Sequence, residues 1–446
     1  MIHRLLVAAL AALPLIAAEP GVVPPTLPAT VAATTGTGAA LGLEEAIRLA
    51  LQRNETVAIA RARMDRAEAN RRASVAALLP QLSAFGTYGN TSQTTGGPWS
   101  AEPSKNVTGE LRLELLLFDA AAYPRVRAAS RNAQAVGQDA AELRRSLAYE
   151  VVAAYLDILL YERGREAALR RRQVSEKTLS DTKARVDAGL ATRNDTLRVA
   201  LENSTAELNV IQAGQLLLAA RLTLSDLLAG PEGDRPIAVP APALLPSREP
   251  VVLVDLARRT RADLKATDLR RQAATEQRRS ALNSGYYPKL GARLSYFDQE
   301  LSGANAYEQD PSWQAALVAS WSLYDGGANY ALADVSEAEA REFAATLGAQ
   351  GRGLVRDLGT AVAALGAAEA GLAQARSGME FALSNRDAVT AKAQQGLATP
   401  LEQADANASV FDAERSLVLA QNTLLLAHFN IRSLVGWWPL GERQPE

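Results

Sequence analysis

Two copies of the tetrapeptide Gly-Leu-Ala-Thr lie at residues 189–192 and 396–399, each between two long segments of helical periodicity. Glycine readily takes the left-handed conformation that ends a helix, and threonine is a good N-cap for the helix that follows. The sequence therefore predicts two tight turns at which the chain reverses direction between helices. The predicted turn residues are Gly189, Leu190 and Thr192 in the first copy and Gly396, Leu397 and Thr399 in the second.

The residues that follow each turn support this interpretation. Asp195 follows Thr192 by three residues and Glu402 follows Thr399 by three, which is the capping-box spacing. Pro400 also occupies the first helical position after the second turn, where proline is preferred. The same device is therefore predicted to start a helix after both turns.

An internal repeat is indicated by the separation of the turns, which is 396 − 189 = 207 residues in a chain of 446. Matching positions recur at nearly the same offset, since Pro80 and Pro288 are 208 residues apart and the pairs 118–119 and 324–325 are 206 apart. A period this long indicates a duplicated domain rather than a solenoid of short units. Each copy is expected to contain the same set of helices and strands.

The ends of the chain and the segment between the copies differ in composition from the rest. The apolar run from Leu5 to Ala18 follows Arg4, ends in small residues and is too short to span a bilayer, so it predicts a secretory signal peptide. The chain contains no cysteine, which excludes disulfides and a lipidated N-terminal cysteine. The predicted segments are a signal peptide at 1–18, a flexible Pro/Thr/Ala-rich leader at 19–40, a first repeat at 41–229, a proline-rich linker at 230–250, a second repeat at 251–437 and a C-terminal tail at 438–446.

Alternation with a period of two predicts four strands. From residue 110 to residue 117 every odd position is leucine, whereas Glu110, Arg112 and Glu114 occupy even positions. One face of this strand is therefore apolar and the other largely charged, although a half-buried sheet on a soluble core would also alternate in this way. The predicted strands lie near 82–90, 108–118, 290–298 and 313–324.

The fourth predicted strand favours a membrane. Trp313 and Trp321 would lie on one face, roughly 26 Å apart at ~3.3 Å per residue, which is comparable with the apolar band and aromatic girdles of outer-membrane barrels. Four strands cannot close such a barrel, and an open sheet edge is not tolerated in lipid. The chain is therefore expected to share its barrel with copies of itself.

Long helices are predicted on both sides of each turn, after a first helix from 43 to 78. No proline interrupts residues 125–188, which would form roughly 95 Å of helix at 1.5 Å per residue. The helix after the first turn has a heptad-like row of apolar residues, which Ser204 and Gln215 interrupt. The helix expected at about 328–395 is rich in alanine and glycine, which permit close helix packing although glycine lowers helix propensity. Such helices suit an elongated coiled-coil bundle or tube.

Residues for catalysis, metal binding or nucleic-acid binding do not form a recognisable pattern. The only histidines are His3, in the predicted signal peptide, and His428, so neither a metal site nor a catalytic triad can be assembled. Gly348, Gly351 and Gly353 lack the spacing of a phosphate-binding loop. The formal net charge of −2 does not indicate nucleic acid. We expect no enzyme, no cofactor and no metal site.

The chain resembles the outer-membrane efflux and secretion ducts typified by TolC, over essentially its whole mature length. The resemblance rests on the repeat, on the paired turns followed by acidic residues, on the strand-to-helix junctions LFDAAAYPRVRAA and LYDGGANYALA, and on the closing NIRSLVGWW. It implies an α+β membrane protein, a homotrimer in which four strands from each copy form one twelve-stranded outer-membrane β-barrel. A long α-helical coiled-coil tunnel would continue the barrel through the periplasm and dock with a periplasmic adaptor (a membrane fusion protein) and an inner-membrane pump.

The resemblance implies the conduit of a tripartite efflux pump or of a type I secretion system. The alternative from the residues alone is a structural or adhesive periplasmic coiled-coil protein without a conduit. That alternative explains the helices and the signal peptide but not the tryptophan-flanked strand. The family includes ducts for drugs, metals, polysaccharide precursors and proteins, and the sequence leaves the cargo open.

Gate residues follow from the same resemblance. In the family's name-giving member an acidic pair three residues apart follows the second turn and rings the tunnel entrance, and the matching positions here are Glu402 and Asp405. Spacing i, i+3 places both carboxylates on one helix face. Capping explains Glu402 equally well, whereas Asp405 is too far from the N-cap. Asp195 matches Glu402 in the first copy, but Arg198 replaces the second acid there, so the acidic charge would come mainly from the second copy.

The two turns are expected to lie together at the periplasmic end. There Leu190 and Leu397 would present apolar side chains to a hairpin of the adaptor. The alternative is that the turns only end helices and contact no partner.

Around a narrow axis, the acidic gate residues of three copies would favour cations and bind divalent or trivalent blockers.

Overall fold

The computed structural model describes residues 40–94, 101–240, 244–302, 307–395 and 397–441. The predicted signal peptide, the predicted leader except its last residue, and the tail after residue 441 lie outside these ranges. The chain divides into two units, Met1–Thr37 and Gly38–Glu446, and all the elements below belong to the second.

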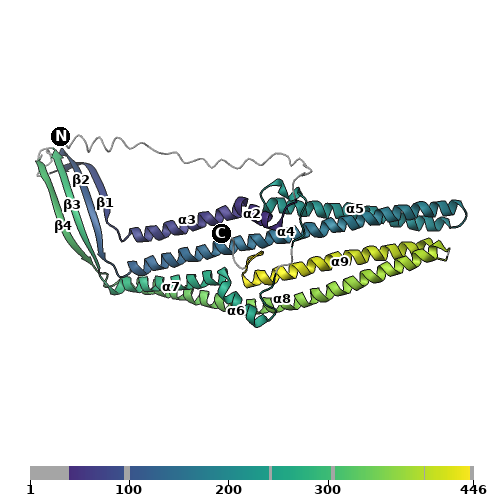
Figure 1. Ribbon diagram of the computed structural model, residues 1–446. Coiled ribbons are helices and arrows are strands. Elements are labelled where there is room, and N and C mark those ends of the chain that lie inside the picture. Colours follow the sequence, from purple (N-terminus) through teal and green to yellow (C-terminus); the bar gives the residue numbers. More distant parts are fainter. Residues whose placement is uncertain (1–39, 95–100, 241–243, 303–306, 396, 442–446) are drawn as a thin grey trace. The chain divides into compact units, whose positions relative to one another are not determined.

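The described chain is mostly helical, with one antiparallel sheet (Figure 1). Among the described helices, none combines the length and the apolar character that crossing a membrane requires. The helices are α2 (Leu43–Arg53), α3 (Glu55–Ala76), α4 (Ala122–Asp187), α5 (Arg193–Leu227), the short 3₁₀ helix η1 (Pro231–Asp234), α6 (Pro250–Thr260), α7 (Ala262–Tyr286), α8 (Ala328–Gln394) and α9 (Pro400–Val435). The strands are β1 (Gln81–Thr94), β2 (Ala101–Phe118), β3 (Lys289–Ser302) and β4 (Tyr307–Ser320).

The strands pair in the order β1-β2-β3-β4, each antiparallel to its neighbour. The register places Leu113 of β2 opposite Leu82 of β1 on one side and opposite Leu294 of β3 on the other. β1 and β4 are the edge strands, and neither has a second partner among the described strands. The sheet is therefore open at both edges in a single chain.

The fourth strand ends earlier than predicted from the sequence. β4 ends at Ser320, whose partner Lys289 is the first residue of β3. Pro288 precedes Lys289 and has no amide proton with which to extend the ladder. Trp321 therefore lies beyond the strand, and the expectation that Trp313 and Trp321 share one strand is wrong.

The helix predicted from 43 to 78 is interrupted at Asn54, where the backbone is extended and α2 gives way to α3. The Asn54 side chain accepts a hydrogen bond from the Thr56 amide at 2.9 Å, and its Nδ2 donates to the Leu227 carbonyl of α5 at 3.0 Å. α3 therefore starts where α5 ends. The expectation of one continuous helix is wrong, because the apolar periodicity on both sides of Asn54 conceals the break.

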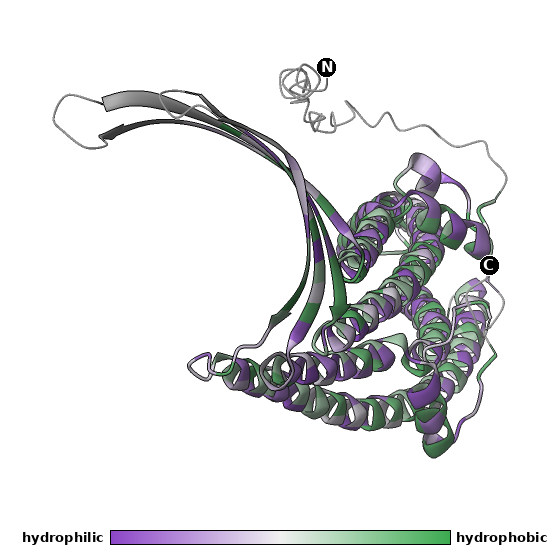
Figure 2. Cartoon of the chain, turned by 90° about the vertical axis from the view of Figure 1, so that its left-hand side faces the viewer, coloured by the Kyte–Doolittle hydropathy of each residue, from purple (hydrophilic) through white to green (hydrophobic). Residues whose placement is uncertain are grey.

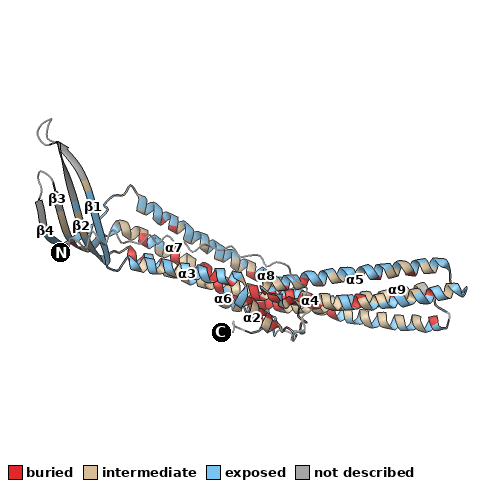
Figure 3. Cartoon of the chain, turned by 90° about the horizontal axis from the view of Figure 1, so that it is seen from above, coloured by how far each residue is buried: buried red, intermediate tan, exposed pale blue. Residues whose placement is uncertain are grey.

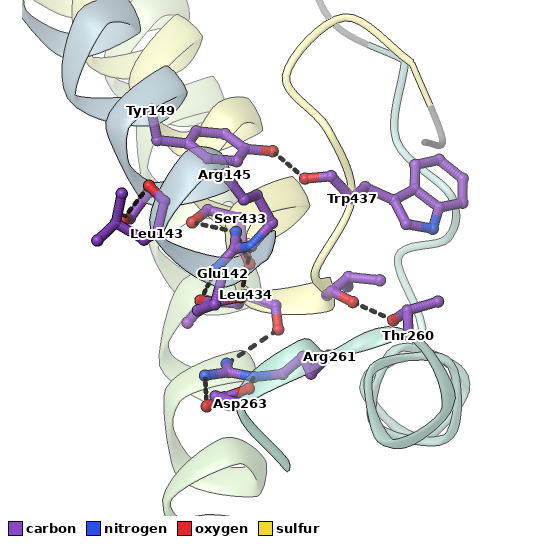
Figure 4. A network of polar contacts seen from close by, with 12 residues as sticks. Glu142, Leu143, Arg145, Tyr149, Thr260, Arg261, Asp263, Ser433, Leu434 and Trp437 are labelled. Atoms are coloured by element: carbon purple, nitrogen blue, oxygen red, sulfur yellow. Dashed lines mark hydrogen bonds and ion pairs between the residues drawn. The ribbon is translucent and has the colours of Figure 1, made fainter. Parts of the chain in front are cut away.

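α7 starts in a similar way at the end of α9 (Figure 4). The hydroxyl of Thr260 donates to the Val435 carbonyl, and Nη1 of Arg261 donates to the Leu434 carbonyl at 3.2 Å. The Asp263 carboxylate holds the Arg261 guanidinium through Nε and Nη2, at 2.9 and 2.7 Å. Two pairs of shorter helices, α5 with α3 and α9 with α7, are thus joined end to end beside the uninterrupted α4 and α8.

Buried side chains gather where α2 and α6 pack on the long helices (Figure 3). Tyr155 is fully buried in the cluster that includes α2, and Leu253 and Leu358 are fully buried in the cluster that includes α6. Arg432 is also buried, and its Nη2 donates to the Trp438 carbonyl at 2.9 Å, which fixes the segment after α9. The core therefore lies at the level of the two helix junctions rather than at the turns or in the sheet.

The long helices form a row with two free edges. In the half next to the sheet, α4 contacts α3 and α7, and α8 contacts α7. In the half next to the turns, α4 contacts α5 and α9, α5 also contacts α9, and α8 contacts α9. The order is therefore α3-α4-α7-α8 in one half and α5-α4-α9-α8 in the other, with α5 also touching α9. Because β1 follows α3 and β4 precedes α8, each edge strand of the sheet is connected to an edge helix of the row. The first edge consists of β1, α3 and α5, and the second edge consists of β4 and α8.

Candidate docking and gating site at the helix turns

The first turn joins α4 to α5 at Gly189, whose φ of 74° is left-handed. The amide of Leu190 donates back to the Arg185 carbonyl at 2.8 Å, which is the six-to-one hydrogen bond of a Schellman motif. The amide of Asp195 donates to Thr192 Oγ1 at 3.3 Å, and the amide of Thr192 donates to Asp195 Oδ2 at 2.9 Å. The capping box predicted after this turn is present.

The second turn, between α8 and α9, repeats these contacts. Gly396 lies outside the described residues, but the amide of Leu397 donates to the Lys392 carbonyl at 2.9 Å, as its counterpart does in the first turn. The amide of Glu402 donates to Thr399 Oγ1 at 3.2 Å, and the amide of Thr399 donates to Glu402 Oε2 at 2.8 Å. The second capping box is therefore present as well.

An apolar side chain projects from each turn. Leu190 is 79% exposed and Leu397 is 73% exposed. In a Schellman motif this position commonly packs against the preceding helical turn, so the exposure leaves apolar surface uncovered. Helix termination explains the glycine and threonine of each turn but not the two leucines.

The acidic residues near the turns differ in their partners. Hydrogen bonds from the side chain and backbone of Thr192 lower the pKa of Asp195, and those from the backbone and side chain of Thr399 lower the pKa of Glu402. Asp405 is exposed, and its carboxylate has no partner within the described chain. Glu402 is therefore a capping residue in the single chain, whereas Asp405 is available to a second molecule or an ion. The described part of the chain contains no group of three or more His, Cys, Asp or Glu side chains suited to a metal ion.

Replacing the N-cap threonines should loosen the turns. Thr192→Ala or Thr399→Ala removes the acceptor of one amide and a donor to one carboxylate, at a local cost of about 1 kcal/mol. Amide hydrogen exchange in peptides that span the altered turn should be about fivefold faster, while peptides from α2 and α6 keep their protection. Unchanged exchange in both variants would contradict the capping role.

Acidification should loosen the same turns in the unaltered protein. The carboxylates of Asp195 and Glu402 have lowered pKa values in the folded state. Their stabilisation is therefore complete above the ordinary carboxyl range near pH 4, and it is lost as the pH falls through the lowered values. As the pH is lowered from 6 to roughly 3, amide exchange in the turn peptides of the unaltered protein, corrected for the intrinsic rate, should become faster. This increase should be larger than the corresponding increase in Thr192→Ala or Thr399→Ala.

The two faces of the sheet differ in polarity, as the alternating colours of the strands indicate (Figure 2). On one face Arg112 pairs with Glu110 at 2.8 Å, and Arg293 pairs with Glu114 at 2.9 Å. The sequence did not predict the second pair, because it depends on the register between β2 and β3. The exposed large side chains on the opposite, apolar face include Leu82, Leu111, Leu113, Leu294, Trp313 and Leu317.

Exposed aromatic side chains lie at two levels of the sheet. At one level Trp313 of β4 is paired with Tyr296 of β3. At the other level, where strands meet helices, the indole Nε1 of Trp321 donates to the Gly285 carbonyl at 3.2 Å. The sequence pattern missed most of the second level because its members lie outside the alternating segments. This level comprises Tyr123, Tyr286, Tyr287, Trp321, Tyr324 and Tyr330.

Solved structures with a similar fold are outer-membrane and membrane proteins. They include a membrane protein from Pseudomonas aeruginosa, with a TM-score of 0.78 and 20% identity over 88% of this chain and 93% of that chain. The outer membrane protein VceC from Vibrio cholerae has a TM-score of 0.77 and 20% identity over 90% of this chain and 97% of that chain. The open state of the MtrE outer membrane channel from Neisseria gonorrhoeae has a TM-score of 0.75 and 19% identity over 90% of this chain and 91% of that chain. These likenesses establish the fold.

The family is established by the sequence itself. No curated protein matches the chain. The model of the family described as outer membrane efflux protein matches residues 46–230 and 253–437, which together include both turns and all four strands. Proteins of this family are outer-membrane channels that extend into the periplasm. Because the two matched segments make up most of its length, the chain belongs to the outer membrane efflux protein family.

Proposed function

We propose that the protein is the outer-membrane channel of a tripartite efflux pump or of a type I secretion system, and that it works as a homotrimer. Three copies would join edge to edge, so that twelve strands close one β-barrel and the helices continue it as a tunnel through the periplasm. The main support is the sheet, which has one apolar face and two unpaired edge strands in the single chain. When further copies close the sheet into a barrel, both edge strands are paired, and unpaired strand edges are not tolerated in lipid.

The spacing of the two aromatic levels supports a membrane-spanning sheet. Tyr287, two residues before the start of β3, and Tyr296 of β3 mark the two levels and are nine residues apart, or about 30 Å at 3.3 Å per residue. A strand tilt of 35–45° shortens this to roughly 23 Å, close to the apolar band of about 25 Å in outer-membrane barrels. Trp313 and Trp321 would then belong to opposite aromatic girdles, with Trp321 outside the strand.

An internal twofold repeat forms part of the proposal. The helix junctions at Asn54 and Arg261 are 261 − 54 = 207 residues apart, the same offset as the two turns. The two segments matched by the family model also begin 253 − 46 = 207 residues apart. A duplicated domain accounts for all three intervals.

The alternative from the sequence, a structural or adhesive coiled-coil protein without a conduit, has no support in the family match. It explains the turns and the long helices, but it gives no reason for exposed leucines along one whole face of the sheet. Native mass spectrometry of the detergent-extracted protein distinguishes the two. The channel predicts a stable homotrimer, whereas a monodisperse folded monomer would rule it out.

We also propose that the two turns dock a periplasmic adaptor through Leu190 and Leu397. The support is that each turn exposes one leucine that helix termination does not need. Leu190→Asp and Leu397→Asp should each reduce cross-linking to the adaptor at least about tenfold, equivalent to roughly 1.4 kcal/mol, while the homotrimer stays intact. Leu244→Asp is the matched control, because Leu244 is a similarly exposed leucine in the segment between the two internal repeats. Unchanged cross-linking in intact trimers would leave the turns with a purely structural role.

The gate is proposed to lie just beyond the same turns, with Asp405 as its main acidic residue. Glu402 and Asp195 would contribute less, because hydrogen bonds from Thr399 and Thr192 already occupy their carboxylates. Three copies of Asp405 around one axis would favour cations over anions. We propose no enzymatic step and no resident cofactor.

A further inference from the structure

A cavity lies between the two helical hairpins that carry the turns. α4 and α5 form the first hairpin, α8 and α9 form the second, and all four helices contribute to the walls of this hairpin cavity. Its volume is about 300 Å³. Sites for small molecules enclose roughly 300–1,000 Å³, so the hairpin cavity is large enough for such a molecule. The larger apolar residues that line it, together with one alanine of α9, are Val174, Val199, Met379, Leu383, Ala408 and Phe411.

The charged side chains that line the hairpin cavity already have partners in this chain. Arg171 Nε donates to Glu202 at 3.0 Å, and the Arg171 guanidinium lies 4.7 Å from the ring centroid of Phe411. A charged ligand would therefore lose its hydration without gaining a free counter-charge, which is costly. The cavity suits an uncharged molecule instead. The other ion pairs at its walls are Arg170 with Glu414 and Arg386 with Asp387.

The hairpin cavity begins where the polar contacts between the two hairpins end. Arg163 Nη1 donates to Gln421 Oε1 at 2.9 Å, and Arg170 pairs with Glu414 seven residues nearer to the turns along each helix. Closer to the turns than this pair, the described residues contain no hydrogen bond or ion pair that joins the two hairpins. A molecule in the cavity would therefore connect the hairpins where the chain's own polar contacts between them stop.

The cavity also reaches the part of α9 that carries the proposed gate. Ala404 lines the cavity and is followed directly by Asp405, the main acidic residue of that gate. Consecutive residues of a helix are turned about 100° apart, so Asp405 projects in a different direction from Ala404. A molecule that fixes Ala404 against the first hairpin would thereby also fix the backbone that carries Asp405.

We propose that the hairpin cavity binds an uncharged, planar aromatic molecule, and that binding holds the two hairpins in the arrangement of this structure. Phe411 and Met379 both favour contact with an aromatic ring. Because the walls come from both hairpins, the site loses its shape when they separate, and a ligand that binds one arrangement shifts the population toward it. The connection to the gate rests on the proposed function, whereas the binding itself does not.

Amide hydrogen exchange of the purified homotrimer with N-phenyl-1-naphthylamine, an uncharged aromatic probe, tests the site. At a free probe concentration of about four times its Kd, exchange that requires the hairpins to separate should slow about fivefold in peptides covering 170–178 and 404–411. Peptides from α2 should keep their rates. The anionic relative 8-anilino-1-naphthalenesulfonate, at the same concentration, should slow exchange less than about twofold. Equal or greater slowing by the anion would overturn the assignment to uncharged ligands.

Variants that fill the hairpin cavity distinguish binding there from binding elsewhere. Ala408→Phe fills it from α9, and Val174→Phe fills it from α4, where the 43% exposure of Val174 leaves room for a larger side chain. Both variants should form trimers whose exchange no longer responds to the probe, and Val174→Phe keeps the test decisive if Ala408→Phe does not assemble. Ser416→Phe is the matched control, because Ser416 is an exposed residue of α9 outside the cavity lining, and it should respond as the unaltered protein does.

Two results would overturn the site and leave the channel standing. One is a homotrimer whose exchange does not respond to N-phenyl-1-naphthylamine, and the other is a response that persists undiminished in the cavity-filling variants. An unaltered protein that is monomeric by native mass spectrometry would instead remove the homotrimer, and with it the proposed gate.

Discussion

Leu317→Arg should abolish the membrane-assembled form of the protein. Leu317 is 81% exposed on the apolar face of β4, four residues from both Trp313 and Trp321. In the proposed barrel it faces lipid near the midplane, where an arginine costs about 2–4 kcal/mol. Three copies would incur this cost together, roughly 6–12 kcal/mol in all, which is comparable with the whole stability of many folded domains.

Val318→Arg is the matched control for this substitution. Val318 is the next residue of β4 and lies on the opposite face of the sheet, paired with Gly291 of β3. In the proposed barrel it faces the water-filled lumen, so the variant should assemble and add positive charge to the pore. Trimers are measured in outer-membrane fractions by gel mobility with and without heating. Loss of assembly in Val318→Arg but not in Leu317→Arg would mean that the face bearing Val318 is the one that meets lipid. Equal assembly of the two variants would contradict the assignment of one face to lipid and the other to the lumen.

Asp405→Asn should weaken block of the channel by divalent or trivalent cations added on the periplasmic side. The Asp405 carboxylate is exposed and has no partner within the described chain, so the three carboxylates of a trimer would meet only ions and water at the entrance. We expect the blocking concentration to rise at least about tenfold, which corresponds to roughly 1.4 kcal/mol of binding. Single-channel recording in planar bilayers measures the effect.

Glu402→Gln distinguishes a role of the Glu402 charge in the gate from the role of the side chain in the capping box. Glutamine can still occupy the N3 position of a capping box, so the helix start should persist while the negative charge is lost. Because the Glu402 carboxylate already accepts hydrogen bonds from Thr399, its loss should change block less than the loss of Asp405. Unchanged block in the double variant Glu402→Gln/Asp405→Asn, with the trimer intact, would remove both residues from the gate.

The two turns could be predicted from the sequence because each is specified locally. A glycine, an N-cap threonine and an acid three residues later form a motif in which every hydrogen bond joins residues a few positions apart. The same locality explains why the capping box of Glu402, and the absence of a capping contact at Asp405, could be predicted from spacing alone. What the turns dock, in contrast, depends on surfaces contributed by other molecules.

The break at Asn54 was missed because its cause is not local. Asn54 separates α2 from α3, and its side chain meets the Leu227 carbonyl, 173 positions away in the sequence. Asparagine is a good N-cap, which was the available signal, but apolar residues at helical spacing continue on both sides. The hydrogen bond from Asn54 Nδ2 to the carbonyl of Leu227, the last residue of α5, is the contact that the sequence pattern does not reveal.

The end of β4 cannot be predicted from the sequence of the strand itself, for a related reason. Alternation continues through Trp321 and Leu323, so the pattern alone extends the strand. Pairing stops at Ser320 because β3 begins at Lys289, immediately after Pro288. The length of a strand in a sheet is set by its partner, and the partner lies elsewhere in the sequence.

Conductance of the purified protein in planar bilayers tests most directly whether copies of this chain enclose a continuous conduit across the outer membrane. Trimers of confirmed mass should produce discrete conductance steps that prefer cations and that multivalent cations block from the turn-bearing side. Trimers that insert into the bilayer yet conduct no ions, with the Asp405→Asn variant equally silent, would contradict the claim.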